Sequence, residues 1–278
     1  MRIDSSGVTL DVQVEGEGRP VVLLHGFPDT KRLWSKQVPA LVDAGFQVIV
    51  PDQRGYGASD KPSEVESYSI PFLAIDVTAI LDHLGLERAH VVGHDWGAAV
   101  AWATAAFAPE RVDHLVALSV GHPTAFSSMG MSQREKSWYM LLFQFRDIAE
   151  QWLTMNDWAN FREWSQHPDT DAVISDLQRD KSLTSGLDWY RANIPPQALI
   201  DPPLELPAVQ APTMGMWSSG DFALLEEQMS GSSKYCVNSF RYERIDGPGH
   251  WMQWEAPDRV NALLLDFLPR SQRSRTVA

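Results

Sequence analysis

The chain has 278 residues, of which 44% are hydrophobic, and a formal net charge of −13 at pH 7, which argues against nucleic acids and anionic membranes as partners. Its single cysteine, Cys236, excludes an internal disulfide and a cysteine metal site. We expect a cytoplasmic protein, because the first residues lack a signal-peptide core and no apolar run reaches membrane-spanning length.

Strand and helix patterns alternate over the first 121 residues. Residues 8–14 alternate apolar and polar side chains, and residues 20–24 form a continuous apolar run typical of a strand buried on both faces. Such alternation with short Gly or Pro connections predicts an α/β fold with a mostly parallel, doubly wound sheet. We expect strands over 8–14, 20–24, 46–50, 88–92 and 114–120, and helices over 33–44, 71–84 and 98–107.

The character of the sequence changes after Gly121. Residues 122–205 show only helical patterns, dense in Trp, Phe, Tyr and Met, and we interpret them as an all-helical lid (cap) inserted over the sheet. The core is then formed by residues 1–121 and 206–270, followed by a polar tail, 271–278, that we expect to be disordered. Within these segments we expect lid helices over 135–145, 147–155 and 157–167, strands over 213–217 and 240–245, and helices over 222–229 and 260–267.

The sequence Gly93-His94-Asp95-Trp96-Gly97 joins an apolar strand to a helix. Glycines two places before and after the apex let strand and helix approach each other in a tight bend, as in the G-x-S-x-G nucleophile elbow. Here Asp95 occupies the serine position. A carboxylate there can attack a saturated carbon without a base to deprotonate it. Taken alone, the motif fits a simple tight crossover equally well.

Two further loops strengthen the catalytic interpretation. Asp221 follows the strand predicted over 213–217, and His250 follows the next strand in Asp246-Gly247-Pro248-Gly249-His250. Ligands of open parallel sheets collect outside the carboxyl ends of the strands. A histidine after a glycine turn is commonly structural, but nucleophile, acid and histidine in this chain order match the triad of α/β-hydrolases.

The chain resembles the α/β-hydrolase superfamily over nearly its whole length, and within it the epoxide hydrolase branch. The matching residues are His25-Gly26-Phe27-Pro28, Asp52-Gln53-Arg54-Gly55-Tyr56-Gly57, Gly93-His94-Asp95-Trp96-Gly97, Asp221-Phe222, Gly249-His250-Trp251, Trp138-Tyr139 and Asp188-Trp189-Tyr190-Arg191.

This resemblance implies a two-step hydrolysis of a small apolar epoxide by water. Asp95 attacks a ring carbon, and the departing oxygen is bound by the lid phenols Tyr139 and Tyr190, which stay protonated at neutral pH. The spacing around Tyr139 also fits a packing residue of an amphipathic helix. The acyl ester on Asp95 is then hydrolysed by water that His250 activates and Asp221 orients.

The remaining site residues follow from the same resemblance. Backbone N–H groups of Phe27 and Trp96 would form the oxyanion hole. The side chains of Trp96, Trp138 and Trp189 would bind substrate. We expect neither a cofactor nor a metal, and the sequence leaves the oligomeric state open.

Three alternatives compete with this interpretation. Haloalkane dehalogenases share the Asp elbow and the late Asp and His, and Trp96 with another lid Trp offers indole donors for a halide; many of them, however, have Asn where Phe27 stands and need no paired tyrosines. The second alternative is another hydrolase of the same fold, and here Ala98 and Ala99 argue against a fluoroacetate dehalogenase and the Asp apex argues against an esterase. The third is a ligand-binding protein that has lost its chemistry.

Overall fold

The computed structural model, which describes residues 1–202 and 205–270, is built around one eight-stranded sheet. Its strand order is β1-β2-β4-β3-β5-β6-β7-β8, in which β2 pairs antiparallel with both β1 and β4 and every other pairing is parallel. The predicted mostly parallel sheet is confirmed. The strands are β1 Arg2–Ser5, β2 Val8–Glu15, β3 Arg19–Leu24, β4 Phe46–Asp52, β5 Ala89–His94, β6 Val112–Leu118, β7 Thr213–Ser218 and β8 Phe240–Ile245.

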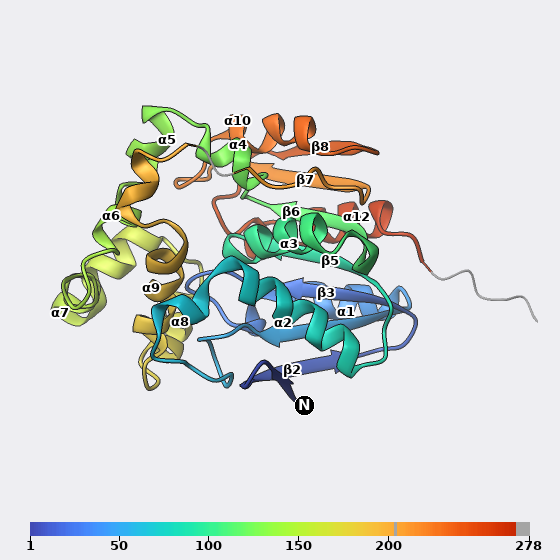
Figure 1. Cartoon of the computed structure of the whole chain (residues 1–278), viewed down its shortest axis with the longest axis horizontal. Coiled ribbons are helices and arrows are strands. Elements are labelled where there is room, and N and C mark those ends of the chain that lie inside the picture. The colour runs from blue at the N-terminus through green and yellow to red at the C-terminus, as the bar shows by residue number, and fades with distance from the viewer. Residues whose placement is uncertain (203–204, 271–278) are drawn as a thin grey trace, which may run out of the picture.

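Helices cover both faces of the sheet (Figure 1). Along β3, Val22 and Leu24 pack into one apolar cluster, and Val21 and Leu23 pack into another on the opposite face. This alternation follows from the two-residue period of a strand, and it explains why a central strand is apolar throughout. The first cluster includes α2 (Ile70–His83) and α3 (Trp96–Phe107); the second includes α1 (Gln37–Asp43) and α12 (Pro257–Phe267).

The segment that we interpret as a lid contains helices and no strand within its described residues. Figure 1 shows α5 to α9 gathered beyond one end of the sheet. Inside α7, residues 155–158 leave helical backbone geometry, so the two helices expected over 147–155 and 157–167 are real but share one kinked element. The helices are α4 Pro123–Ser127, α5 Met131–Lys136, α6 Trp138–Leu142, α7 Ile148–Ser165, α8 Thr170–Leu177, α9 Ser182–Asn193 and the 3-10 turn η4 Pro196–Leu199.

Strand β5 passes directly into helix α3 through Asp95, whose φ of 53° is unusual for a residue with a side chain. A Cβ on Gly93 would collide with the carbonyl oxygen of Gly97, and one on Gly97 would collide with that of Leu24. The two glycines therefore provide the close approach that the motif predicts, and they hold Asp95 at the turn.

The structure differs from the sequence prediction in several places, among them the lid segment 135–145, where α5 and α6 replace the single expected helix. The antiparallel strand β1 was not anticipated, because four residues are too few for a clear pattern. The helix expected over 33–44 is a 3-10 turn, η1 (Lys31–Trp34), followed by α1. The helix expected over 222–229 begins only at Glu226, as α10 (Glu226–Ser230), although Asp221 accepts the N–H groups of Ala223 and Leu224 as a helix N-cap would.

The remaining elements are the 3-10 turns η2 (Val65–Tyr68), η3 (Pro109–Arg111) and η5 (Gly231–Tyr235), and helix α11 (Met252–Glu255). The expected tail, 271–278, lies outside the described residues. No helix in the described part of the chain is long and apolar enough to cross a membrane.

Gly93→Ala should destabilise the protein by roughly 3 kcal/mol, because the added methyl group meets backbone that cannot move without shifting α3. Gly231→Ala is the matched control. Gly231 has right-handed helical backbone geometry, and a Cβ added to it would have no atom within 4 Å, so its unfolding free energy should change by less than about 0.5 kcal/mol. Urea unfolding of both variants measures the difference, and equal stabilities would contradict the packing argument.

Candidate active site

Asp95 lies at the turn between β5 and α3, with 8% of its surface exposed. Its Oδ1 accepts a hydrogen bond of 2.9 Å from the backbone N–H of Phe27, which follows β3. The backbone nitrogen of Trp96 is also close to this carboxylate. A Cβ added to Gly26 would touch the Asp95 side chain and would come within 2.7 Å of the Trp96 nitrogen. The structure thus brings the nucleophile candidate together with both predicted oxyanion-hole residues.

His250 lies between two carboxylates that come from different strand ends. Its Nδ1 is 2.9 Å from Asp221 Oδ2, and its Nε2 is 3.7 Å from Asp95 Oδ2. Asp221 Oδ1 accepts the N–H groups of Ala223 and Leu224 at 2.8 and 2.9 Å, which fix the carboxylate. The three residues form the arrangement of an orienting acid, a base and a nucleophile.

The backbone of His250 is also held in place. Its carbonyl oxygen is 2.9 Å from His94 Nε2 and accepts a hydrogen bond of 3.3 Å from the Ser119 hydroxyl. Burial, with the nearby His250 adding to it, lowers the pKa of His94 to about 4, so His94 is neutral at pH 7. A neutral His94 can donate its Nε2–H to the carbonyl, which supports a structural role for this residue.

The two carboxylates determine the charge of His250. Burial alone lowers its pKa, but the adjacent Asp221, with a further contribution from Asp95, outweighs burial and raises the pKa to about 10. Burial acts to raise the pKa of Asp221, but His250 and the two backbone donors hold that pKa below its ordinary value. His250 is therefore an imidazolium at neutral pH, beside a charged Asp221.

Tyr139 of α6 and Tyr190 of α9 are both buried above this triad, and their ring centroids lie 6.1 Å apart. Tyr190 packs edge-to-face on Trp96 and Phe27, with centroid separations of 5.1 and 5.7 Å. Burial and then the charge of Asp95 raise the pKa of each phenol well above its ordinary value. Both tyrosines therefore keep their protons and can act as hydrogen-bond donors.

The residues on either side of Tyr190 tie α9 to its surroundings. Arg191 forms paired contacts of 3.0 and 3.1 Å with Glu150 of α7 and donates to the carbonyl of Phe143 at 2.9 Å. The indole N–H of Trp189 donates to the carbonyl of Arg54 at 3.0 Å. These contacts fix the position of the phenol between them.

The predicted substrate-binding tryptophans lie in different environments. Trp96 is buried beside Tyr190, and Trp189 is fully buried between Trp96 and Tyr56. The structure does not bring Trp138 to the triad: its ring is 49% exposed and packs on Trp152. Successive residues of a helix point about 100° apart, so burying Tyr139 turns Trp138 outward.

Two features of the site were not predicted from the sequence. Asp29 is a third buried carboxylate, which accepts the Trp251 indole N–H at 2.9 Å and lies 3.2 Å from His167 Nε2 in the lid. Trp164 of α7 packs against Tyr139, with ring centroids 4.9 Å apart. The sequence position of Asp29, two residues after Phe27 in the loop that follows β3, could have indicated that it belongs to the site. Only the three-dimensional packing identifies Trp164.

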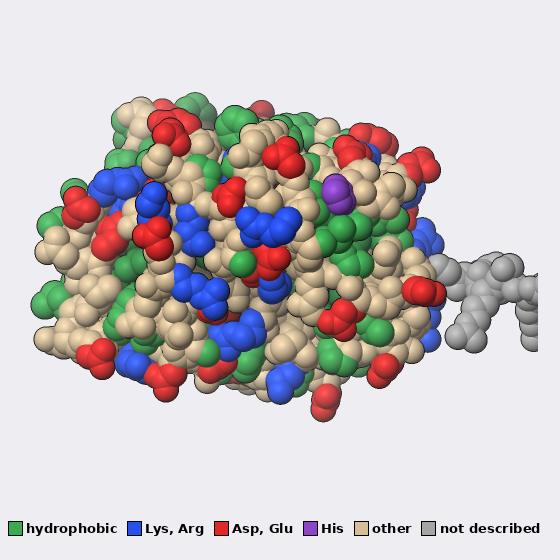
Figure 2. Space-filling view, turned by 90° about the horizontal axis from the view of Figure 1, so that it is seen from below, with side chains coloured by type: hydrophobic (Ala, Val, Ile, Leu, Met, Phe, Trp, Pro, Cys, Tyr) green, Lys and Arg blue, Asp and Glu red, His purple; other side chains and the backbone are tan. Residues whose placement is uncertain are grey.

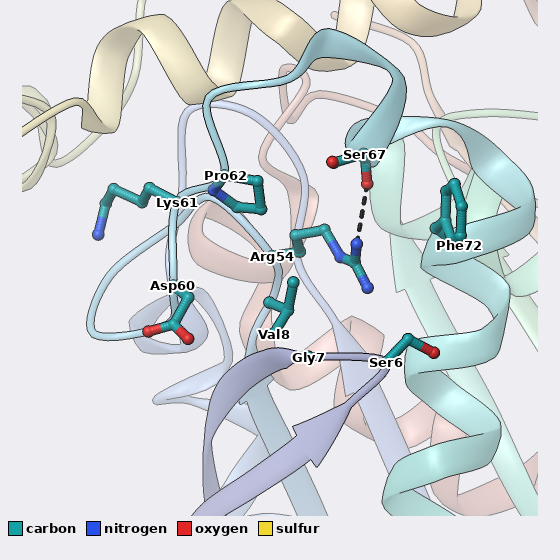
Figure 3. A pocket seen from close by; sticks show the side chains of 9 residues that line it. All are labelled: Ser6, Gly7, Val8, Arg54, Asp60, Lys61, Pro62, Ser67 and Phe72. Atoms are coloured by element: carbon teal, nitrogen blue, oxygen red, sulfur yellow. Dashed lines mark hydrogen bonds between the residues drawn. The ribbon is translucent and has the colours of Figure 1, made fainter.

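Two surface hollows beside β2 lie outside this centre. One, of about 550 Å³, is lined by Arg54, whose guanidinium pairs with Asp76 and donates to the Ser67 carbonyl (Figure 3). The other, of about 570 Å³, is lined by Lys31, which pairs with Asp52. Figure 2 shows Lys and Arg side chains interspersed with Asp and Glu on the face viewed there. Within the described residues no group of three or more His, Cys, Asp or Glu could hold a metal ion.

Comparison with known proteins agrees with this geometry. Residues 19–257 match the family described as having the α/β hydrolase fold. The chain is 33% identical to epoxide hydrolase A of Mycobacterium tuberculosis, over 96% of each protein. It belongs to the epoxide hydrolase branch of the α/β-hydrolase family. The resemblance expected from the motifs is confirmed.

Further relatives span almost the full length of this family member. It is 35% identical to the AB hydrolase superfamily protein YfhM of Bacillus subtilis, over 96% of each protein. The crystal structure of epoxide hydrolase A from Mycobacterium thermoresistibile, 32% identical, superposes with a TM-score of 0.82 and covers 96% of this chain and 97% of that one.

Asp95→Asn should lower the pKa of His250, because it removes a negative charge that favours the imidazolium. An NMR titration of the ring nitrogens of ¹⁵N-labelled histidine measures this pKa directly. Asp4→Asn, which neutralises an exposed carboxylate on β1, is the control and should leave the titration of His250 unchanged. A His250 pKa that is equal in wild type and Asp95→Asn would show that the two groups are not electrostatically coupled.

Proposed function

We propose that this protein hydrolyses small apolar epoxides to vicinal diols through a covalent ester on Asp95. The observation that carries the proposal is the position of two neutral lid phenols, Tyr139 and Tyr190, above a carboxylate nucleophile. Opening an epoxide needs a nucleophile on one side and a proton donor for the departing oxygen on the other. This site contains both.

In the first step a carboxylate oxygen of Asp95 attacks an epoxide carbon and the ring C–O bond breaks. The electron pair of that bond goes to the ring oxygen, which Tyr139 and Tyr190 bind and protonate. Phe27 N–H holds Oδ1, so Oδ2, on the side of His250, is the oxygen free to attack. The product is a hydroxyalkyl ester of Asp95.

In the second step water attacks the carboxyl carbon of this ester, and the acyl C–O bond breaks to release the diol. Esterification removes the negative charge that faces His250 Nε2, so the pKa of the imidazole falls from its raised value. The imidazolium can then pass its proton to the phenolate left by the first step and accept one from water, with Asp221 orienting it, while the second proton of that water goes to the leaving oxygen of the diol. The N–H groups of Phe27 and Trp96 stabilise the tetrahedral oxyanion.

The lining of the site supports an apolar substrate. Phe27, Phe143, Trp96 and Trp164 surround the two phenols with aromatic rings. Trp189 contributes from behind Trp96, and Trp138 has no part in the pocket. Aromatic walls with a few convergent donors are typical of sites that bind small apolar molecules.

The competing interpretations have less support. Trp189 cannot complete a halide site with Trp96, because its indole N–H is already donated to the carbonyl of Arg54, so a halide site would depend on Trp164 of the lid. A non-catalytic binding protein would not need His250 and Asp221 at hydrogen-bond distance beside a held carboxylate. Neither alternative explains two buried phenols facing Asp95.

A small panel of epoxides and alkyl halides, assayed for diol and halide together, tests the function. Wild type should form diol from styrene-type epoxides and release little halide, and Asp95→Asn should lose at least about 1000-fold in turnover. Halide release without diol formation would move the assignment to a dehalogenase. Binding of epoxides without turnover would exclude catalysis.

His250→Gln should form the ester but hydrolyse it about 1000-fold more slowly, because only the second step needs a base. Intact-protein mass spectrometry after addition of epoxide should then show an adduct of one substrate mass. His83→Gln, at an exposed position of α2, is the matched control and should turn over without accumulating an adduct. Absence of the adduct in His250→Gln would contradict the two-step scheme.

Replacing both Tyr139 and Tyr190 by Phe should slow formation of the ester itself by about 100-fold or more, because the departing oxygen loses its proton donors. Rapid-quench mass spectrometry of a single turnover measures this step. Tyr235→Phe, whose ring stacks on His122 away from the phenol pair, should form the ester at the wild-type rate. An unchanged rate in the double variant would remove both phenols from the mechanism.

A further inference from the structure

Trp164 lies at the centre of the aromatic roof over the triad. Besides Tyr139, its ring approaches that of Phe27, the residue that supplies the oxyanion donor, with a centroid separation of 6.2 Å. It also approaches Phe222, which follows Asp221, with a separation of 6.3 Å. One side chain of the lid therefore contacts the neighbourhoods of the proton donor, the oxyanion hole and the orienting acid.

The indole nitrogen of Trp164 is buried and has no hydrogen-bond partner among the described residues. Its aromatic neighbours Phe27, Phe143, Phe161 and Phe222 offer no acceptor atom. By contrast, Trp189, Trp251 and Trp254 each donate their indole N–H to a protein oxygen. The indole of Trp34 is also without a partner among the described residues, but it lies in the apolar cluster on the other face of the sheet. Buried donors in native proteins are nearly always paired, so a buried donor left unpaired beside a substrate site calls for a functional explanation.

We infer that Trp164 is a specificity-determining residue whose indole N–H binds an acceptor oxygen in the side chain of the substrate. This inference rests on the proposed epoxide hydrolysis and names the class of epoxide that the site prefers. Tyr139 binds the epoxide oxygen, and the Trp164 ring lies directly against the Tyr139 ring. The acceptor must therefore lie only a few bonds from the three-membered ring.

Epoxides with an ether or ester oxygen one carbon away from the ring meet this requirement. In such a substrate the epoxide oxygen faces the phenols and the second oxygen faces the indole. A purely hydrocarbon epoxide of the same shape would fill the same space but leave the buried N–H unpaired. Sites that contain a buried donor discriminate against analogues that lack the matching acceptor.

The test compares phenyl glycidyl ether with 4-phenyl-1,2-epoxybutane, in which a methylene group replaces the ether oxygen. Wild type should show a kcat/KM about tenfold higher for the ether, as expected for one hydrogen bond. Trp164→Phe, which keeps a ring but lacks the donor, should reduce this ratio to less than about twofold. The ratio between two substrates is insensitive to a general loss of active protein.

Trp138→Phe is the matched control, because it alters a lid tryptophan that lies on the outside, and it should keep the wild-type ratio. If Trp164→Phe does not fold, incorporation of benzothienylalanine at position 164 replaces the N–H by sulfur in a ring of nearly the same shape. A ratio that stays at the wild-type value in either Trp164 variant would overturn the inference, while diol formation by wild type would still support the proposed function. Failure of wild type to hydrolyse either epoxide would instead overturn the proposed function and this inference with it.

Discussion

The proposed chemistry of this protein depends on one imidazole placed between two buried carboxylates. Asp221 is held by two backbone N–H groups and Asp95 by one, so neither carboxylate can turn away from His250. The charge on the ring therefore depends on the charge of the nucleophile. In the proposed cycle, the reaction that consumes the negative charge of Asp95 also changes His250 from an acid into a base, so the same geometry serves two successive steps.

In the proposed cycle the lid keeps the phenols of Tyr139 and Tyr190 protonated. Burial and the charge of Asp95 both raise the pKa of Tyr139 and Tyr190 and favour their neutral form. The buried environment of Asp95 therefore keeps the phenols protonated. An open, wet site would weaken both effects, because water screens charge and solvates ions. The aromatic roof is thus part of the electrostatics as well as of substrate binding.

The sequence predicted which residues meet at the candidate site better than it predicted their surroundings. Asp95, Asp221 and His250 each follow a strand, and the carboxyl ends of parallel strands meet at one edge, so pattern alone brings them together. The start of α10 could not be predicted, because Asp221 accepts the N–H groups of Ala223 and Leu224 as a helix N-cap would, yet the helix begins only at Glu226. The pairing of Asp29 with His167 joins residues 138 positions apart, and no local pattern indicates it.

The four residues 188–191 have a consequence for how this family member can change. The three residues of this stretch other than Tyr190 each bind a different segment of the chain. Asp188 pairs with Arg146, Trp189 donates to the carbonyl of Arg54, and Arg191 pairs with Glu150 of α7. A substitution in this stretch disturbs the proton donor along with the pocket. New substrate preferences can therefore evolve most easily through the second half of α7, where pocket shape changes while Tyr190 in α9 stays where it is.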